Sequence, residues 1–463
     1  MVLKLPENVK KIIHTLQDAG FEAYAVGGCV RDALLGREPD DWDITTSALP
    51  EQVKKLFART IDTGLQHGTV TVLFRAGNDG WDTYEVTTFR IDGVYEDARH
   101  PKDVTFTPSL EEDLKRRDFT INAMAYNETA GLVDCFDGLS DLKSKKIRCV
   151  GDPKERFTED ALRMMRVVRF AAQLGFTVVP ETLKQIRELA PRLAMIIAER
   201  IQTELVKLLV SDHPDKFEML YEGGLTDVFL PEFSALMETP QHSKHHGETA
   251  GEHTLISLKK VRADKVLRLA MLFHDIAKPV CRTTDESGED HFHGHPQIGA
   301  EMTRIILRRL KFDNDTIRQV QTLVRIHDER IIRMEKDEDT PDGRQLKAVR
   351  RAVSRNGEEV YPNLFAVMRA DILAQSEWMR TQKLALVDRY EKCWREICQK
   401  NQCLSIKDLA IDGSDLIAQG IPSGPGIGTI LHEMLEDVLD EPGNNNKEYL
   451  LEHLEIYQKR EGK

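Results

Sequence analysis

Two glycines, an arginine and two aspartates near the N-terminus have the residue types and spacing to handle a nucleoside triphosphate. Gly27 and Gly28 open the stretch GGCVRDALLGREPDDWD, and without Cβ atoms they let backbone N–H groups approach phosphate oxygens. Arg31 adds a guanidinium group. Asp41 and Asp43 are separated by one residue, so on an extended strand both carboxylates leave the same face and can bind one or two Mg²⁺ ions. This set predicts metal-assisted displacement at phosphorus, that is, nucleotidyl transfer.

The order GG-x-V-R-D followed by D-x-D resembles the signature of the class II nucleotidyltransferases with a polymerase-beta-like head, the family of bacterial tRNA CCA-adding enzymes and poly(A) polymerases. The resemblance implies that Asp41 and Asp43 hold the metal while CTP and ATP are joined to the 3′ end of tRNA. Cys29 fills the variable position of the first motif. Asp40 extends the acidic pair to a run and could compete with Asp41 for the metal.

Glu85 is a third acid, in the strand-like segment TYEVTTFR. A carboxylate on a neighbouring strand would complete the ligand set of a two-metal site, so we expect Glu85 to be a third ligand or to lie close behind the ligands. The alternative is an exposed strand glutamate.

The segment 92–108 is rich in glycine, charge and turn formers and predicts a mobile loop. It carries Arg99 and Lys102 in a basic-x-x-basic spacing. In the resembling family such a loop is associated with enzymes that add the final A, and enzymes that add only CC lack it. The alternative is an ordinary solvated loop.

The string RRDFTINA predicts paired arginines at the start of a helix, suited to triphosphate or ribose oxygens. It is similar to the second nucleotide-binding motif of the family. By that resemblance Arg117 contacts the nucleotide, and Asp118 and Asn122 position or recognise the ribose.

A helix over residues 158–174, with Thr158 as N-cap, would carry a polar stripe, because Asp160, Arg163, Arg166 and Arg169 recur every three residues. An acid and an arginine one turn apart can offer an acceptor and a donor to a base. The string E-D-x-x-R resembles the family motif that selects CTP or ATP, which implies this role for Asp160 and Arg163. Arg166 and Arg169 would then contact phosphate or base. The alternative is an intrahelical Asp–Arg pair.

A second cluster of metal-ligand residue types lies in the middle of the chain. In chain order these candidate ligands are His253, His274, Asp275, His295, His327 and Asp371. The order resembles the HD phosphohydrolase superfamily, which implies a divalent metal of unknown identity and phosphatase or cyclic phosphodiesterase chemistry, with Lys278 neutralising phosphate. The alternative is an HD fold retained as a scaffold.

The expected architecture is an α+β head with a mixed sheet followed by helices. The expected parts are a nucleotidyltransferase head (1–142), a helical neck (143–238), an HD-type helical domain (239–385) and a helical tail (386–463). Helices are expected at 7–19, 114–126, 158–174, 180–189 and 198–209. Strands are expected at 23–26, 69–74 and 84–88.

Composition bounds the remaining possibilities. The chain has 463 residues, and its seven cysteines form no C-x-x-C pair, which argues against a disulfide framework or a thiolate zinc site. We find no bilayer-spanning run or signal peptide, so a cytoplasmic protein without a membrane partner is expected. The net charge is −13, yet residues 143–210 hold 14 Lys/Arg and 8 Asp/Glu. This basic segment of the neck, residues 143–210, is suited to the phosphates of a tRNA acceptor end.

The leading hypothesis is a tRNA nucleotidyltransferase that adds 3′-terminal CCA without a nucleic-acid template, with attack of the RNA 3′-hydroxyl on the α-phosphorus and release of pyrophosphate. The alternatives are a poly(A) polymerase, an enzyme adding only CC or only A, a protein that is mainly an HD phosphohydrolase, and a non-catalytic RNA-binding protein. The sequence leaves open whether the protein is a monomer or a dimer.

Overall fold

The structure, a computed structural model, describes residues 2–76, 80–93, 104–242, 247–329, 331 and 343–460. The chain divides into two compact units, Met1–Ser234 and Ala235–Lys463. An α+β head followed by a mostly helical remainder confirms the predicted fold class, while the finer division into four parts stays a prediction. The predicted loop residues Arg99 and Lys102 lie outside the described residues. No helix in the described ranges has the length and apolar character to cross a membrane.

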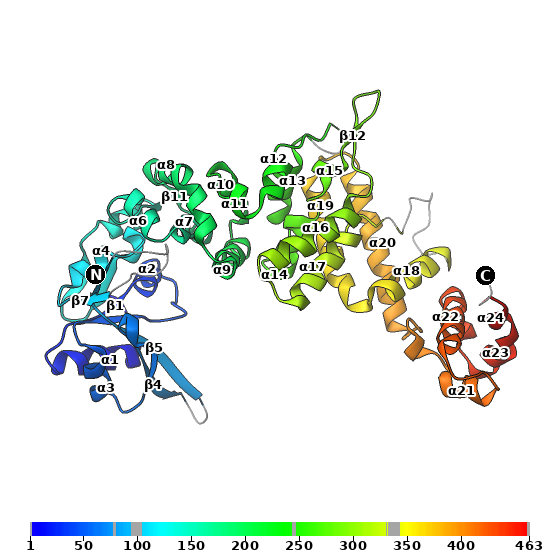
Figure 1. The fold of residues 1–463 in the computed structure, drawn as a ribbon, viewed down its shortest axis with the longest axis horizontal. Helices are drawn as coiled ribbons and strands as arrows, with labels where there is room; N and C mark the ends of the chain where they lie inside the picture. The colour runs from blue at the N-terminus through cyan, green and yellow to red at the C-terminus, as the bar shows by residue number, and fades with distance from the viewer. Residues whose placement is uncertain are drawn as a thin grey trace. The chain divides into compact units, whose positions relative to one another are not determined.

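A seven-stranded mixed sheet forms the core of the first unit (Figure 1). The strands lie in the order β3-β4-β5-β2-β1-β8-β9, and only the β2–β5 pair is parallel. Their bounds are β1 Ala23–Val26, β2 Ile44–Thr46, β3 Thr60–Gly64, β4 Thr69–Ala76, β5 Gly80–Thr88, β8 Met124–Asn127 and β9 Gly131–Asp134. Three of them confirm the predicted strands.

Helix α1 (Glu7–Asp18) begins after Pro6 and buries Val9, Ile12 and Leu16, a spacing that forms one apolar face. It packs on β1 and on α3 (Pro50–Leu56), while α2 (Gly28–Leu34) packs on β1 and β8. Gly27 and Gly28 therefore lie at the junction between β1 and α2.

The helix predicted at 114–126 is wrong. Helix α4 (Leu110–Lys115) ends there instead, Phe119 is extended, and β8 pairs with β1 inside the sheet. Residues 118–127 are buried without interruption, and such a run has neither a helical nor an alternating period to read. The paired arginines thus follow the end of a helix rather than opening one.

The helix predicted at 158–174 is in fact two helices, α6 (Pro153–Glu159) and α7 (Leu162–Leu174). Asp160 between them is extended (φ −138°, ψ 104°), and its carboxylate accepts a hydrogen bond from the backbone N–H of Leu162. Thr158 is therefore not a cap; the N-cap of α6 is Asp152. Helices α8 (Pro180–Leu189) and α9 (Ala198–Leu209) confirm their predictions.

Further elements of the first unit are short. They are α5 Gly138–Lys143, α10 Glu218–Glu222, α11 Thr226–Phe229, the pair β6 Arg90–Asp92 with β7 Val104–Phe106, and the pair β10 Lys146–Ile147 with β11 Thr177–Val178. Helix α12 (Pro231–Met237) runs across the division between the units.

The second unit is helical apart from one two-residue strand pair, within the described residues. Its helices are α13 Ala250–Leu258, α14 Lys265–Phe273, α15 Lys278–Cys281, α16 His295–Arg309, α17 Asn314–Ile326, α18 Gly343–Asn356, α19 Tyr361–Ala374, α20 Arg380–Gln399, α21 Gly413–Ala418, α22 Pro425–Asp440, α23 Lys447–Glu452 and α24 Leu454–Arg460. The strands are β12 Thr283–Thr284 and β13 Asp290–His291. Helices α21 to α24 share a separate apolar cluster that includes Leu416, Met434 and Leu450.

Candidate active site

A cavity of about 180 Å³ in the first unit brings acids and arginines together. Asp43, Glu85 and Arg117, three residues predicted from the sequence, line it, and so do Arg90 and Arg116. Asp43 directly precedes β2, and its carbonyl oxygen accepts the N–H of Val26 on β1 at 3.0 Å. Glu85 lies on β5, the parallel neighbour of β2. The cavity therefore brings carboxylates and guanidinium groups together.

The electrostatics of Asp43 fit a divalent cation. Its surroundings raise its pKa, chiefly through desolvation, and the charges of Glu85 and Asp41 raise it further while Arg117 lowers it. Asp41 lies in the segment just before β2 rather than on the strand. Since burial and the two neighbouring carboxylates disfavour the charge of Asp43, a divalent cation with hard oxygen ligands would stabilise that charge.

Asp113 of α4 holds the arginines of this cavity, a role that we did not predict. Its side chain is fully buried; Oδ1 accepts from Arg116 Nη2 at 2.7 Å, and Oδ2 accepts from Arg117 Nη2 at 3.3 Å and from Thr45 Oγ1 at 3.2 Å. Burial would raise its pKa, but the two arginines outweigh burial and lower it. The only sequence signal was the i,i+3 and i,i+4 spacing to the arginines.

Gly27 allows Arg117 to lie against the backbone. Its φ of +85° is in the left-handed region, and a Cβ at this position would lie 3.0 Å from Arg117 Nη1. A Cβ at Gly28 would meet Arg31 Nη2 at an ordinary 3.6 Å. The first glycine is thus required by both conformation and close approach.

Four predicted nucleotide-binding residues form one hydrogen-bonded chain. Arg31 Nη1 donates to Asn122 Oδ1 at 2.7 Å, and Asn122 Nδ2 donates to Asp118 Oδ1 at 3.2 Å. Arg166 on α7 donates through Nε to Asp118 Oδ2 at 2.8 Å. Burial disfavours the Asp118 charge, but Arg166 outweighs it and lowers the pKa of Asp118 to about 2. The network joins α2, the Thr120–Asn122 turn and α7.

The side chains of Asp160 and Arg163 bind other partners, although the backbone N–H of Arg163 donates to the carbonyl oxygen of Asp160 at 3.0 Å. Asp160 Oδ2 accepts from Arg200 Nη2 on α9 at 2.7 Å. Arg163 pairs with Glu159 and donates through Nη2 to the carbonyl of Arg116 at 3.1 Å. Asp160 lies before α7 and Arg163 within it, so the two residues do not belong to one continuous helix.

Arg169, predicted to contact phosphate or base, is buried. Its Nε is 2.5 Å from Glu204 Oε2 on α9, and its guanidinium group lies 3.8 Å from the centre of the Phe170 ring. Burial lowers the pKa of Arg169 to about 10. The guanidinium groups of Arg31 and Arg166 also lie over Phe170, at 5.0 and 5.5 Å from the centre of its ring. Phe170 and Glu204 thus support the arginine cluster, and neither was predicted.

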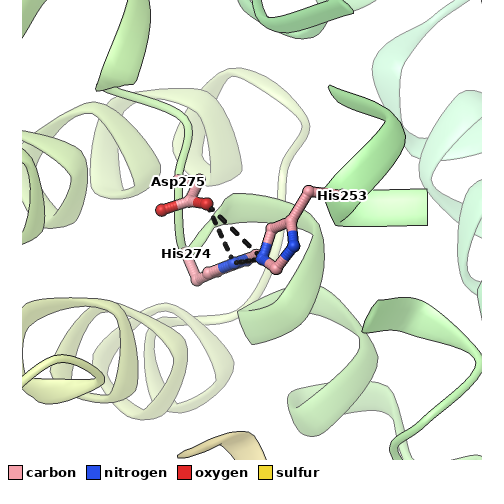
Figure 2. A group of neighbouring side chains, drawn as sticks. All are labelled: His253, His274 and Asp275. Atoms are coloured by element: carbon pink, nitrogen blue, oxygen red, sulfur yellow. Dashed lines mark hydrogen bonds and ion pairs between the residues drawn. The ribbon is translucent and has the colours of Figure 1, made fainter. Parts of the chain in front are cut away.

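The second predicted site is assembled in the second unit. Figure 2 shows His253 of α13 facing His274 and Asp275, which follow α14; His274 Nε2 lies 3.3 Å from His253 Nε2 and 3.2 Å from Asp275 Oδ2. His253 Nε2 lies 2.9 Å from Asp371 Oδ1 on α19. His295 Nε2 lies 3.4 Å from Asp275 Oδ1.

Three of these imidazoles have a fixed tautomer. The Nδ1 atoms of His274, His295 and His327 lie 2.7 or 2.8 Å from backbone carbonyl oxygens three residues earlier. A carbonyl oxygen only accepts, so each Nδ1 carries a proton, and in the neutral imidazole Nε2 presents a lone pair. This is the arrangement that metal-binding histidines require.

Two groups of three ligands share Asp275. They are His253, His274 and Asp275, and Asp275, His295 and His327; in each group the ligand atoms lie within 4.8 Å of one another. Within the described ranges these are the only such groups, so Asp41, Asp43 and Glu85 do not form one. Burial disfavours the charge of Asp275, but His274 and Lys278 hold its pKa well below the usual range. Burial and the neighbouring His274 and His295 lower the pKa of His327 to about 4. The donor set therefore fits divalent cations.

A cavity of about 1080 Å³ opens beside this site. Asp275, His295, His327 and Asp371 line it, together with Lys278. Lys278 Nζ lies 2.7 Å from Asp275 Oδ2. A substrate in the cavity would contact both the candidate metal ligands and the ammonium group of Lys278.

Family models match three stretches of the chain. A poly A polymerase head domain matches residues 23–148, a probable RNA and SrmB-binding site of polymerase A matches 175–237, and a putative tRNA nucleotidyltransferase domain 2 matches 295–454. The first match covers the mixed sheet and the acid–arginine cavity. Fold and site thus define a nucleotidyltransferase.

Curated relatives specify the family. The CCA-adding enzyme of Lactobacillus helveticus is 37% identical over 460 residues, which cover 98% of both chains. That of Levilactobacillus brevis is 54% identical over 222 residues, a match that spans about half of its length (53%) and 48% of this chain. The chain belongs to the CCA-adding enzymes.

Solved structures agree with this assignment. The CCA-adding enzyme of Bacillus stearothermophilus in complex with CTP is 31% identical, with a TM-score of 0.71 over 99% of this chain and 100% of that one. The Thermotoga maritima enzyme complexed with tRNA has the same fold at 18% identity, with a TM-score of 0.57 over 97% and 94% of the two chains.

Proposed function

We propose that this chain adds CCA to the 3′ end of tRNA from CTP and ATP, with no nucleic-acid template, in the cytoplasm. The observation that carries the proposal is one cavity lined by Asp43 and Glu85 together with Arg90, Arg116 and Arg117. Structures of relatives have been determined in separate complexes with CTP, with ATP and with tRNA. Carboxylates for metal and guanidinium groups for phosphate are the two requirements of phosphoryl transfer.

In this proposal Asp41 and Asp43 hold Mg²⁺, with Glu85 as a third or supporting acid. Bound there, Mg²⁺ supplies Lewis-acid stabilisation of the triphosphate and a lower pKa for the attacking 3′-hydroxyl. Arg116 and Arg117, held by Asp113, bind the triphosphate and steady the pyrophosphate as it leaves. No side-chain base is then needed.

The base and ribose are read by the residues around α7. Asp118 and Asn122 form the ribose-facing part of the network, with Arg31 and Arg166 fixing their orientation. Asp160 supplies an acceptor and Arg163 a donor to the base. The basic neck binds the tRNA acceptor end through phosphates, so affinity should fall as salt rises.

Labelled CTP and ATP, offered with tRNA lacking its last three nucleotides, test the proposal. We expect incorporation by the wild type and loss of at least a thousandfold in Asp43→Asn. Extension by many A residues without CTP would identify a poly(A) polymerase, and incorporation of C alone would identify a partial enzyme. Full activity of Asp43→Asn would contradict the assigned role of the acid.

A second activity is favoured by the three tautomer-fixed imidazoles around Asp275. We propose a metal-dependent phosphohydrolase in the second unit, in which His253, His274, Asp275, His295 and His327 would hold the divalent metal and Lys278 would lie beside the phosphate. Hydrolysis of nucleotide phosphate esters with Mn²⁺, Co²⁺ or Ni²⁺ should be lost in His274→Ala and retained in Asp43→Asn. If neither His274→Ala nor Asp43→Asn hydrolyses any ester with any of these ions, the second unit is a scaffold.

A further inference from the structure

The cavity beside the candidate metal ligands of the second unit also has an apolar wall. Its volume of about 1080 Å³ is far larger than a phosphate group needs and is comparable with the sites of small organic ligands. Helices α19 and α20 and the turn between them supply this wall. Its apolar lining residues are Met368, Ile372, Trp378, Met379, Leu386 and Val387. The cavity therefore suits a substrate that has an apolar part as well as a phosphate.

One face of α19 brings the apolar wall next to a candidate metal ligand. Met368, Asp371 and Gln375 all line the cavity, and their spacing of three and four residues places them on one side of the chain as it leaves α19. Asp371 Oδ1 lies 2.9 Å from His253 Nε2. The apolar wall thus begins directly beside the ligand cluster.

Hydrogen bonds connect this ligand to an exposed tryptophan of the same cavity. Gln375 Nε2 donates to Asp371 Oδ2 at 3.1 Å, and Gln375 Oε1 accepts from Lys383 Nζ at 2.6 Å. The ammonium group of Lys383 lies over the Trp378 ring, 5.7 Å from its centre. The indole ring therefore has a defined place relative to the candidate metal ligands.

Trp378 offers the cavity an aromatic surface. The residue is 45% exposed, although it lines the cavity. Met379, which follows it, has a φ of 53°, a left-handed conformation that is costly for a residue with a side chain. An exposed indole ring is a surface on which any nucleobase can stack, because every base has a π-face. A phosphate ester of a simple polyol has no group for this surface.

We propose that Trp378 is the specificity-determining residue of the phosphohydrolase site, where it stacks on the base of a nucleoside monophosphate whose phosphate lies beside Lys278. This inference rests on the proposed phosphohydrolase and adds the part of the substrate that is recognised. In the reaction water attacks phosphorus, the ester P–O bond breaks, and the leaving oxygen takes a proton. The products are the nucleoside and inorganic phosphate.

Hydrolysis of AMP and of glycerol phosphate by the full chain, with Mn²⁺, Co²⁺ or Ni²⁺, tests the inference. We expect Trp378→Ala to lower kcat/KM for AMP about 10- to 100-fold, the range of one base–aromatic stack, and to leave kcat/KM for glycerol phosphate unchanged. Trp378→Phe keeps an aromatic face and should keep most of the AMP hydrolysis. Trp81→Ala is the matched control, because Trp81 is 42% exposed and also has a cation, the Arg59 guanidinium group, over its ring.

Tryptophan fluorescence gives a readout that does not depend on hydrolysis. A stacked base quenches indole emission, so AMP added without a metal ion should quench the wild type and Trp81→Ala. The part of this quenching that comes from Trp378 should be absent in Trp378→Phe. AMP bound in the first unit does not mimic this difference, because it would quench Trp378→Phe equally.

The two readouts separate failure of the inference from failure of the phosphohydrolase. Circular dichroism checks the fold of each variant, and Trp378→Leu replaces Trp378→Ala if that protein unfolds. An unchanged ratio of AMP to glycerol phosphate hydrolysis in the folded variant, with no quenching that depends on Trp378, would overturn the inference and leave the phosphohydrolase standing. Quenching that depends on Trp378, in a protein that hydrolyses neither ester, would support base stacking and contradict the phosphohydrolase.

Discussion

Asp113 Oδ1 accepts hydrogen bonds from Nε and Nη2 of Arg116, at 3.0 and 2.7 Å, from a position where no part of the Asp113 side chain reaches solvent. A buried carboxylate that faces two arginines compensates them and fixes where they point. The guanidinium groups of Arg116 and Arg117 in the cavity therefore depend on a residue that does not line it.

Asp113→Asn should raise the KM for CTP and ATP about 10- to 100-fold with a smaller change in kcat. The substitution removes the charge that holds Arg116 and Arg117, and a hydrogen bond to a charged group contributes about 1.5–3 kcal/mol. Steady-state kinetics on tRNA lacking its CCA end measures both KM and kcat. Glu111→Gln is the matched control, since it removes the same charge from an exposed position of the same helix. An unchanged KM in Asp113→Asn would show that the arginines hold their positions without it.

Gly27→Ala should reduce kcat/KM by at least tenfold. The new Cβ would lie 3.0 Å from Arg117 Nη1 and would displace the guanidinium group, and the φ of +85° adds about 1 kcal/mol of strain. Gly20→Ala separates the two effects, because Gly20 has a φ of +86° and a Cβ added there would meet nothing within 4 Å. Equal loss of activity in both variants would attribute the effect to backbone strain alone.

The Asp118–Arg166 pair should make stability depend on pH in the acid range. The pKa of Asp118 is about 2 in the folded chain and about 3.9 when unfolded, so its charge stabilises the fold above pH 4 and this contribution is lost as pH falls toward 2. Asp118→Asn should therefore cost on the order of 2 kcal/mol at pH 7 and progressively less below pH 4. Urea midpoints measured across this range check it. A difference that grows as the pH falls would contradict the assignment.

Metal binding in the second unit should depend on Asp275 and not on the transferase acids. We expect the wild type to bind Mn²⁺ or Co²⁺ at this site, and Asp275→Asn to lose most of this binding because both ligand groups share that carboxylate. Calorimetric titration of the purified full chain measures the stoichiometry.

His432→Ala is the matched control for this measurement, since it removes an exposed imidazole of the same unit. Asp275→Asn should leave CCA addition unchanged. Equal metal binding by Asp275→Asn and the wild type would place the metal elsewhere.

The sequence was informative where one short segment carried a whole motif. Gly27, Arg31 and Asp43 could be predicted as site residues because their proposed chemistry depends on neighbours along the chain. The helix predicted at 114–126 failed because β8 is buried on all sides, so its pattern has no period of its own. The break at Asp160 was missed for a different reason: its carboxylate accepts the N–H that would otherwise continue the turn.

Partners far apart in sequence could not be read at all. Arg200 pairs with a residue 40 positions earlier, and Glu204 contacts Arg169 across two packed helices. Before the fold is known, each looks like any charged residue of an amphipathic helix. The candidate metal ligands of the second unit were easier to predict, because an imidazole beside a carboxylate is itself a signal, although their division into two groups around Asp275 needed the structure.

The 3′ ends made by this protein test the account most directly. Transfer RNA that ends before its CCA is incubated with CTP and ATP together, and the products are sequenced individually. We predict that the chains end in CCA and stop there, that CTP alone gives CC, and that Asp43→Asn leaves the ends unextended. Runs of A added without CTP, or ends unchanged by the folded wild-type protein, would contradict it.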